Sequence, residues 1–154
     1  STDVAEKLDV ANPCLTELNK RTFMSKIQNG GVLTPREALV IGLARADFRL
    51  AAYFAQPILK TDPDDARANF AMGMQHYLEE EWAMSEQYFR RCLKRVPNDP
   101  AVLNNLANVQ ARLGMFAEAE ANVGKALKRL PKSPEVHKTQ SQIKELARKA
   151  KKSK

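Results

Sequence analysis

The sequence predicts an all-α protein built from a repeated pair of helices. Two stretches follow one pattern at a constant offset, so that Met72 corresponds to Leu106 and Pro97 to Pro131. Small residues let two helices cross closely, an aromatic residue fills the gap between them, and a proline cannot extend the second helix. The first stretch places this pattern at Met72, Gly73, Trp82, Ser85, Phe89, Cys92 and Pro97, and the second at Leu106, Ala107, Phe116, Ala119, Val123, Ala126 and Pro131.

Helix start signals agree with this pattern. A capping residue followed by proline is typical of the first turn of a helix, and it occurs at Asn12-Pro13, Thr34-Pro35, Asp99-Pro100 and Ser133-Pro134. Thr34 also has a glutamate three residues later, which completes a capping box. Gly114 falls at the turn between the paired helices of the second stretch, where Glu80 stands in the first and should strain the turn.

The spacing of these positions resembles the tetratricopeptide repeat, a helix-turn-helix unit. Such a unit cannot bury its apolar face alone, so the resemblance implies stacking into a right-handed helical solenoid of about seven helices with a C-terminal capping helix. The side chains expected to be buried between helix pairs are Phe48, Trp82, Phe89, Phe116, Ala119 and Ala126.

The repeat frame divides the chain into five segments. Residues 66–99 and 100–133 are the two full repeats. Residues 32–65 form a degenerate repeat with Pro57 inside its second helix, where a kink is expected. The remaining segments are an N-terminal helical segment, 1–31, with a helix over 13–28, and a basic capping helix and tail, 134–154.

Composition excludes several classes of protein. No apolar run reaches the roughly 20 residues that a bilayer needs, and no signal-peptide pattern opens the chain. These observations favour a cytoplasmic location, although a first residue of Ser rather than Met fits a trimmed N-terminus or a piece of a longer protein.

The charge is uneven along the chain. Residues 125–154 carry eleven Lys or Arg against two Glu, a net charge of +9, whereas residues 1–124 carry fourteen basic and sixteen acidic residues.

No arrangement of residues predicts catalysis, a cofactor or a metal. His76 and His137 lie far apart, and neither has a cysteine or carboxylate at an evident metal-ligand spacing. The carboxylates at 79–81 fall on a turn between helices and are interpreted as solvated. Cys92 takes a small-residue packing position, which indicates a buried thiol. The chain is therefore not expected to be an enzyme.

The resemblance implies that the first helix of each pair lines a concave groove. Asn side chains can bind the backbone of an extended peptide, aromatic and Met side chains offer apolar pockets, and Arg can pair with a carboxylate. For Phe70 and Tyr77 packing against the preceding repeat is an equal alternative. The predicted peptide-binding residues are Arg67, Phe70, Met74, Tyr77, Asn104, Asn105, Asn108, Arg112, Lys138 and Gln142.

The leading hypothesis is a non-enzymatic adaptor or scaffold that binds a peptide or helix of a partner protein in this groove. A carboxylate-clamp role is not expected, because only Asn105 of that residue set is present in frame. Alternatives are a secretion-type chaperone, which the layout resembles but from which the basic C-terminus departs, self-association, and an electrostatic binder of an acidic partner. Nucleic acid is not favoured, since the basic helix lacks aromatic platforms and any groove-reading motif.

Overall fold

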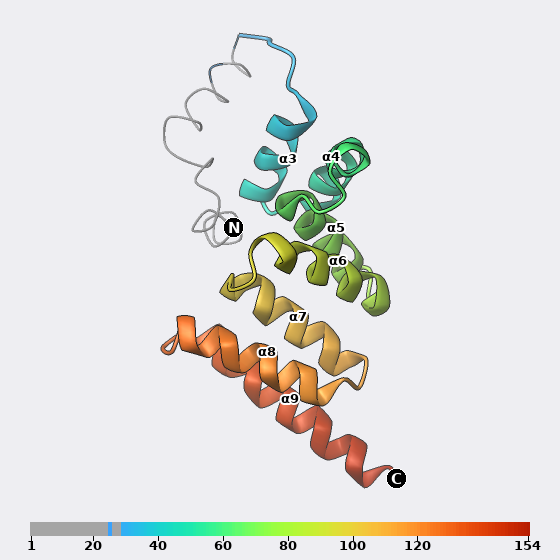
Figure 1. Cartoon of the computed structure of the whole chain (residues 1–154), viewed down its shortest axis with the longest axis vertical. Coiled ribbons are helices and arrows are strands. Elements are labelled where there is room, and N and C mark those ends of the chain that lie inside the picture. The colour runs from blue at the N-terminus through green and yellow to red at the C-terminus, as the bar shows by residue number, and fades with distance from the viewer. Residues whose placement is uncertain (1–24, 26–28) are drawn as a thin grey trace.

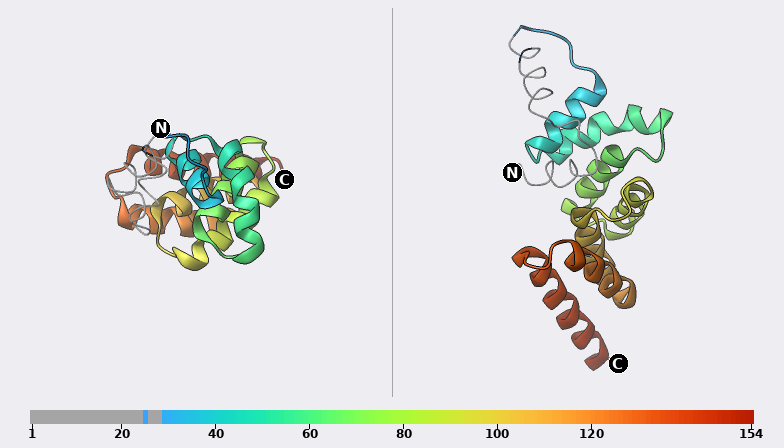
Figure 2. Two further views of the ribbon diagram at one scale, coloured as in Figure 1. Left: turned by 90° about the horizontal axis from the view of Figure 1, so that it is seen from above. Right: turned by 60° about the vertical axis from the view of Figure 1, so that its left-hand side comes forward.

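Seven α-helices and no strand make up the part of the chain that the computed structural model describes, Ser25 and residues 29–154. Figure 1 shows the helices following one another along the long axis, with α3 and α9 at opposite ends, and the right-hand view of Figure 2 agrees. The predicted all-α solenoid is confirmed, and its handedness stays a prediction. The helices are α3 (Pro35–Ala44), α4 (Phe48–Thr61), α5 (Ala66–Leu78), α6 (Trp82–Arg95), α7 (Pro100–Arg112), α8 (Phe116–Arg129) and α9 (Pro134–Lys152).

Three helices, α3, α7 and α9, begin where the start signals predicted. The Thr34 hydroxyl accepts from the Glu37 backbone N–H, and the Glu37 carboxylate accepts from the Thr34 backbone N–H, each at 3.1 Å. Asp99 caps α7 and Ser133 caps α9, each followed by proline. The helix α4 continues through Pro57 to its end, and the expected kink there is not tested. The predicted Asn12 cap and the helix over 13–28 fall on residues outside the described part, apart from the helical Ser25.

The turn geometry repeats with the period of the sequence. Each helix pair is joined by a short turn with one left-handed residue, at Ala46 (φ 53°), Glu80 (φ 59°) and Gly114 (φ 78°). These three positions are evenly spaced by one repeat length, so the pair α3 and α4 shares the register of the two full repeats. Only glycine adopts this conformation without steric cost, so Ala46 and Glu80 each carry strain of about 1 kcal/mol.

Within each pair the helices cross at small residues. A Cβ added at Gly73 would lie 2.6 Å from the Phe89 ring, and the Ser85 hydroxyl donates to the Gly73 carbonyl at 2.9 Å. The second repeat has Ala107 and Val123 in place of Gly73 and Phe89, and both are buried. Ala107 is larger than Gly73 and Val123 is smaller than Phe89, so the crossing is filled by a similar total volume in both repeats.

The two aromatic residues at the start of the second helices differ from expectation. The prediction that Trp82 and Phe116 are buried between the helices of a pair is corrected, because both are only half-buried. Each stands at the first position of its helix, α6 or α8, and packs against one of the two apolar clusters with part of its surface. The other predicted seam residues are buried, namely Phe48, Phe89, Ala119 and Ala126.

Two apolar clusters fill the solenoid, and α7 belongs to both. Its residues Val102, Leu106 and Val109 join the cluster formed with α3 to α6. On the other face of the same helix, Leu103, Ala107 and Ala111 join the cluster formed with α8 and α9. The second apolar face explains why α7 is buried along most of its length, whereas α8 and α9 each bury a single stripe.

An ion pair ties the first described helix to the third. Asp65 is the N-cap of α5, accepts from the Ala68 backbone N–H at 2.9 Å, and forms a two-pronged pair with Arg36 of α3. Burial raises the pKa of Asp65, but the hydrogen bonds from Arg36 and Ala68 and the charges of Arg36 and Arg67 outweigh burial, so the pKa is lowered overall.

We expect Gly73→Ala to lower the free energy of unfolding by roughly 1–3 kcal/mol, because the new methyl overlaps the Phe89 ring. This loss outweighs the gain in helix propensity of about 1 kcal/mol that Ala brings over Gly. Urea unfolding followed by circular dichroism measures it.

The double variant Gly73→Ala, Phe89→Val provides the control, since it copies the Ala107 and Val123 pair of the second repeat. Its loss of unfolding free energy should be smaller than the sum of the losses caused by the two single substitutions. Additive effects of the two substitutions would show that the crossing does not couple them.

Asp65→Asn should destabilise the protein at pH 7 by roughly 1–3 kcal/mol, because Asn still caps the helix but carries no charge for Arg36. The folded-state pKa of Asp65 is depressed, so its contribution is present above the ordinary carboxyl pKa and is lost as the pH falls through the folded value. The difference between wild type and variant should therefore shrink below about pH 4.

Thermal melts from pH 7 down to pH 2.5 measure this difference. Asp47→Asn is the matched control, since Asp47 caps α4 and is exposed. A stability difference for Asp65→Asn that is the same at every pH would contradict the assignment.

Candidate functional site

The helix α7 carries three of the predicted binding residues on one face. Asn105, Asn108 and Arg112 are three and four residues apart, which places them on one side of a helix. Both asparagines are half-buried and Arg112 is exposed. The face is therefore partly open to solvent in the described part of the chain, and its role in binding stays a prediction.

The two asparagines reach the neighbouring first helices on either side. The amide nitrogen of Asn105 donates to the Met74 sulphur of α5 at 3.5 Å, and that of Asn108 donates to the Thr139 hydroxyl of α9 at 3.4 Å. The sequence separation is the same in both contacts, and moving the first pair forward by one repeat gives the second. Equivalent positions thus touch twice, and the two contacts bridge α5, α7 and α9 across one surface.

Two aromatic residues, Tyr77 and Trp82, border this surface at the end of α7, and we call them the aromatic corner. The Arg112 guanidinium carbon lies 5.0 Å from the centre of the Trp82 ring, and the rings of Tyr77 and Trp82 meet edge to face with centres 5.4 Å apart. A cation over an indole face contributes about 0.5–1 kcal/mol at an exposed site. The sequence did not point to Trp82 as a surface residue, because its repeat position indicated only packing. We define the α7 surface as Met74, Tyr77, Trp82, Asn105, Asn108 and Arg112.

Three predicted groove residues are not on an open surface. Phe70 is fully buried, with its ring centre 6.4 Å from that of Phe48 and 5.8 Å from that of Phe89. Arg67 and Asn104 are each only 4% exposed. The prediction that Arg67 and Asn104 line an open groove is corrected, and for Phe70 the alternative of packing against the preceding helix pair holds. They occupy the first half of α5 and α7, which adjacent helices cover. Lys138 and Gln142 are exposed on α9, and their binding role stays a prediction.

The central part of the chain, residues 77–143, matches the family model of the tetratricopeptide repeat. This part of the chain is similar to tetratricopeptide repeats. The match runs from the end of α5 into α9 and so includes the aromatic corner and all of α7. A search of curated proteins found no match.

Tetratricopeptide repeats generally mediate protein–protein interaction, and they are typically non-enzymatic modules. Among the described residues, no helix is long and apolar enough to cross a membrane. The surface described above lies on the first helices of the repeats. Its residues offer hydrogen-bond donors, acceptors and aromatic faces, and they form no nucleophile–base pair.

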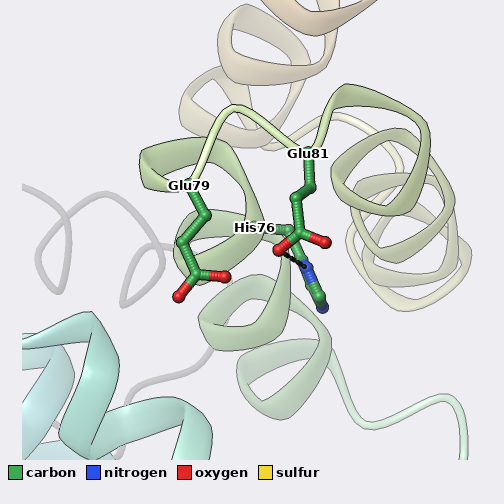
Figure 3. A group of neighbouring side chains, drawn as sticks. All are labelled: His76, Glu79 and Glu81. Atoms are coloured by element: carbon green, nitrogen blue, oxygen red, sulfur yellow. Dashed lines mark hydrogen bonds and ion pairs between the residues drawn. The ribbon is translucent and has the colours of Figure 1, made fainter.

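One side-chain cluster in the first full repeat departs from expectation. His76 Nδ1 lies 3.3 Å from a carboxylate oxygen of Glu81, and Figure 3 shows both beside Glu79 at the α5–α6 turn. Ligand atoms of the three lie within 4.8 Å of one another, so the expectation that no carboxylate stands at a metal-ligand spacing to His76 is wrong. The left-handed Glu80 reverses the chain and brings Glu81 back to His76. One nitrogen and two oxygens form a donor set that zinc accepts.

The local contacts of this cluster also fit a solvated turn. Glu79 and Glu81 are exposed, and Glu79 accepts from the Gln75 amide at 2.6 Å. The ring of His76 stacks on Tyr88 with an interplanar angle of 6°. These contacts hold the imidazole without any ion.

The buried cysteine of the first full repeat is a packing residue. Cys92 is free and fully buried. Burial, followed by the charges of Asp99 and Asp65, raises the pKa of the thiol far above its usual range. A thiol that stays protonated is a poor nucleophile and a poor metal ligand. The predicted role of Cys92 as a buried thiol is confirmed.

Proposed function

We propose that the chain is a non-enzymatic adaptor whose α7 surface binds an extended segment of a partner protein. The observation that carries this proposal is the alignment of Asn105, Asn108 and Arg112 on one open helix face beside an aromatic corner. Lys138 and Gln142 extend the surface along α9.

The chemistry of the surface suits a peptide backbone. An Asn side chain offers both donors and an acceptor, so two of them one turn apart can pair with successive peptide groups. Their present contacts, at 3.4 and 3.5 Å, are long and are readily exchanged for ligand contacts. The exposed Arg112 can pair with a carboxylate of the partner, while Tyr77 and Trp82 offer apolar faces to its side chains.

The double variant Asn108→Ala, Arg112→Ala tests the proposal. Peptides selected from a random display library against the wild-type chain are the probes, and calorimetry measures their affinity. The variant should bind at least tenfold more weakly, a loss of about 1.4 kcal/mol. Its stability should fall by no more than about 2 kcal/mol, because it loses only one long hydrogen bond and one exposed cation–π contact.

The matched control changes the same kinds of side chain on second helices, Gln87→Ala on α6 with Arg129→Ala on α8. Both residues are exposed. Loss of affinity in the control as large as in the test variant, or normal binding by the test variant, would contradict the proposal.

A second candidate function rests on the charge of the C-terminal region. Lys144, Lys151 and Lys152 of α9 are exposed, and residues 125–154 carry a net charge of +9. Such a surface attracts acidic partners through a screened Coulomb interaction. Salt separates the two candidates, because binding through many charges weakens steeply between 50 and 200 mM salt, whereas binding at the α7 surface, with Arg112 as its one charged group, should weaken much less.

A further inference from the structure

A small pocket opens where α5, α7 and α9 meet. Its volume is about 100 Å³, which is close to the liquid volume of three water molecules. This size admits one linear side chain. Its lining includes Phe70, Met74, Asn104, Asn105, Glu135 and Val136.

One of the residues that line the pocket, Asn104, carries a buried hydrogen-bond acceptor without a partner. Asn104 is only 4% exposed, and its side-chain oxygen has no hydrogen bond in the described part of the chain. A buried carbonyl without a donor costs free energy that a bound donor would recover. The unpaired oxygen therefore favours a ligand that donates a hydrogen bond.

Packing alone does not explain an asparagine at this position. One repeat earlier in the chain, the same place is taken by Phe70, which is fully buried in the core. An apolar residue of similar size at 104 would leave no unpaired group. The asparagine instead keeps an unpaired polar atom at this buried position, at a cost in stability.

The surroundings of the oxygen define the ligand further. Phe70 and Val136 provide apolar walls, and Glu135 brings a carboxylate to the edge of the pocket from the first turn of α9. A ligand that matches these features has a linear apolar stem and ends in a positively charged donor. An ammonium group carries three donors and no acceptor, so whichever way it turns it presents a donor to the Asn104 oxygen.

We propose that this pocket binds the side chain of a lysine of the partner segment, with the ammonium donating to the Asn104 oxygen and lying near the Glu135 carboxylate. The inference rests on the proposed function, since the pocket shares Met74 and Asn105 with the α7 surface. It adds a side-chain preference to a surface that otherwise binds a peptide backbone without reading its sequence.

A pair of small probes tests the pocket on the whole chain. N-acetyl-lysine N′-methylamide carries the ammonium, and the norleucine analogue has an unbranched apolar side chain without it. Titration into ¹⁵N-labelled protein, followed by ¹H–¹⁵N correlation spectra, should shift the amide signals of Asn104 and Asn105 with the lysine probe. The norleucine probe should bind about tenfold more weakly, the loss expected for one charge-assisted hydrogen bond. Equal shifts with both probes, or none with either, would overturn the proposal.

Two variants show whether the named groups are responsible. Asn104→Leu removes the acceptor at similar size, and Glu135→Gln removes only the surface charge. Each should weaken the lysine probe by severalfold and leave the norleucine probe unchanged, with Asn105 as the reporter. Lysine binding that survives both substitutions would overturn the assignment.

Failure of this inference can be told apart from failure of the proposed function. The variant Asn108→Ala, Arg112→Ala leaves the pocket intact, so it should lose the selected peptides but keep the lysine probe. Conversely, each lysine of the selected peptides can be replaced by norleucine. Unchanged affinity would refute the lysine pocket but not the binding of peptides at the α7 surface.

Discussion

Close approach of paired helices at small residues is the constraint on which the rest of the structure depends. Gly73 lets the Phe89 ring lie against the α5 backbone, and Gly42 lets α3 meet α4, where an added Cβ would stand 2.9 Å from the Ala51 nitrogen. Such close crossings fix the spacing between the two helices of a pair. On α7, Asn105 and Asn108 stand half-buried on a face that is partly open to solvent.

Much of this architecture is readable from the sequence, because it follows from local rules. The caps at Thr34 and Ser133 depend on residues a few positions away, and the small residues at the crossings recur with the repeat. The exposure of a helix face is different. Phe70 and Asn104 share the face expected of groove residues, yet neighbouring helices cover both, and the extent of that cover depends on the stacking of whole repeats.

The candidate site was predicted only in part, because local periodicity does not show how whole repeats stack. The periodicity of α7 placed Asn105, Asn108 and Arg112 together. It did not reveal that Thr139 would accept from Asn108, although Thr139 occupies the place of Asn105 one repeat later. Nor did it place His76 beside Glu81, because that approach requires Glu80 to adopt a left-handed conformation that its residue type disfavours.

The shared position of α7 between the two apolar clusters has a consequence for how the chain opens. Leu93 touches both clusters, and α7 contributes a different face to each. Melting of α9 alone exposes one stripe and leaves the first cluster intact, whereas melting of α7 removes side chains from both at once. Amide protons of α7 should thus exchange with solvent only when the whole chain unfolds. A helix at the end of a linear array can open without disrupting both clusters, whereas α7 cannot.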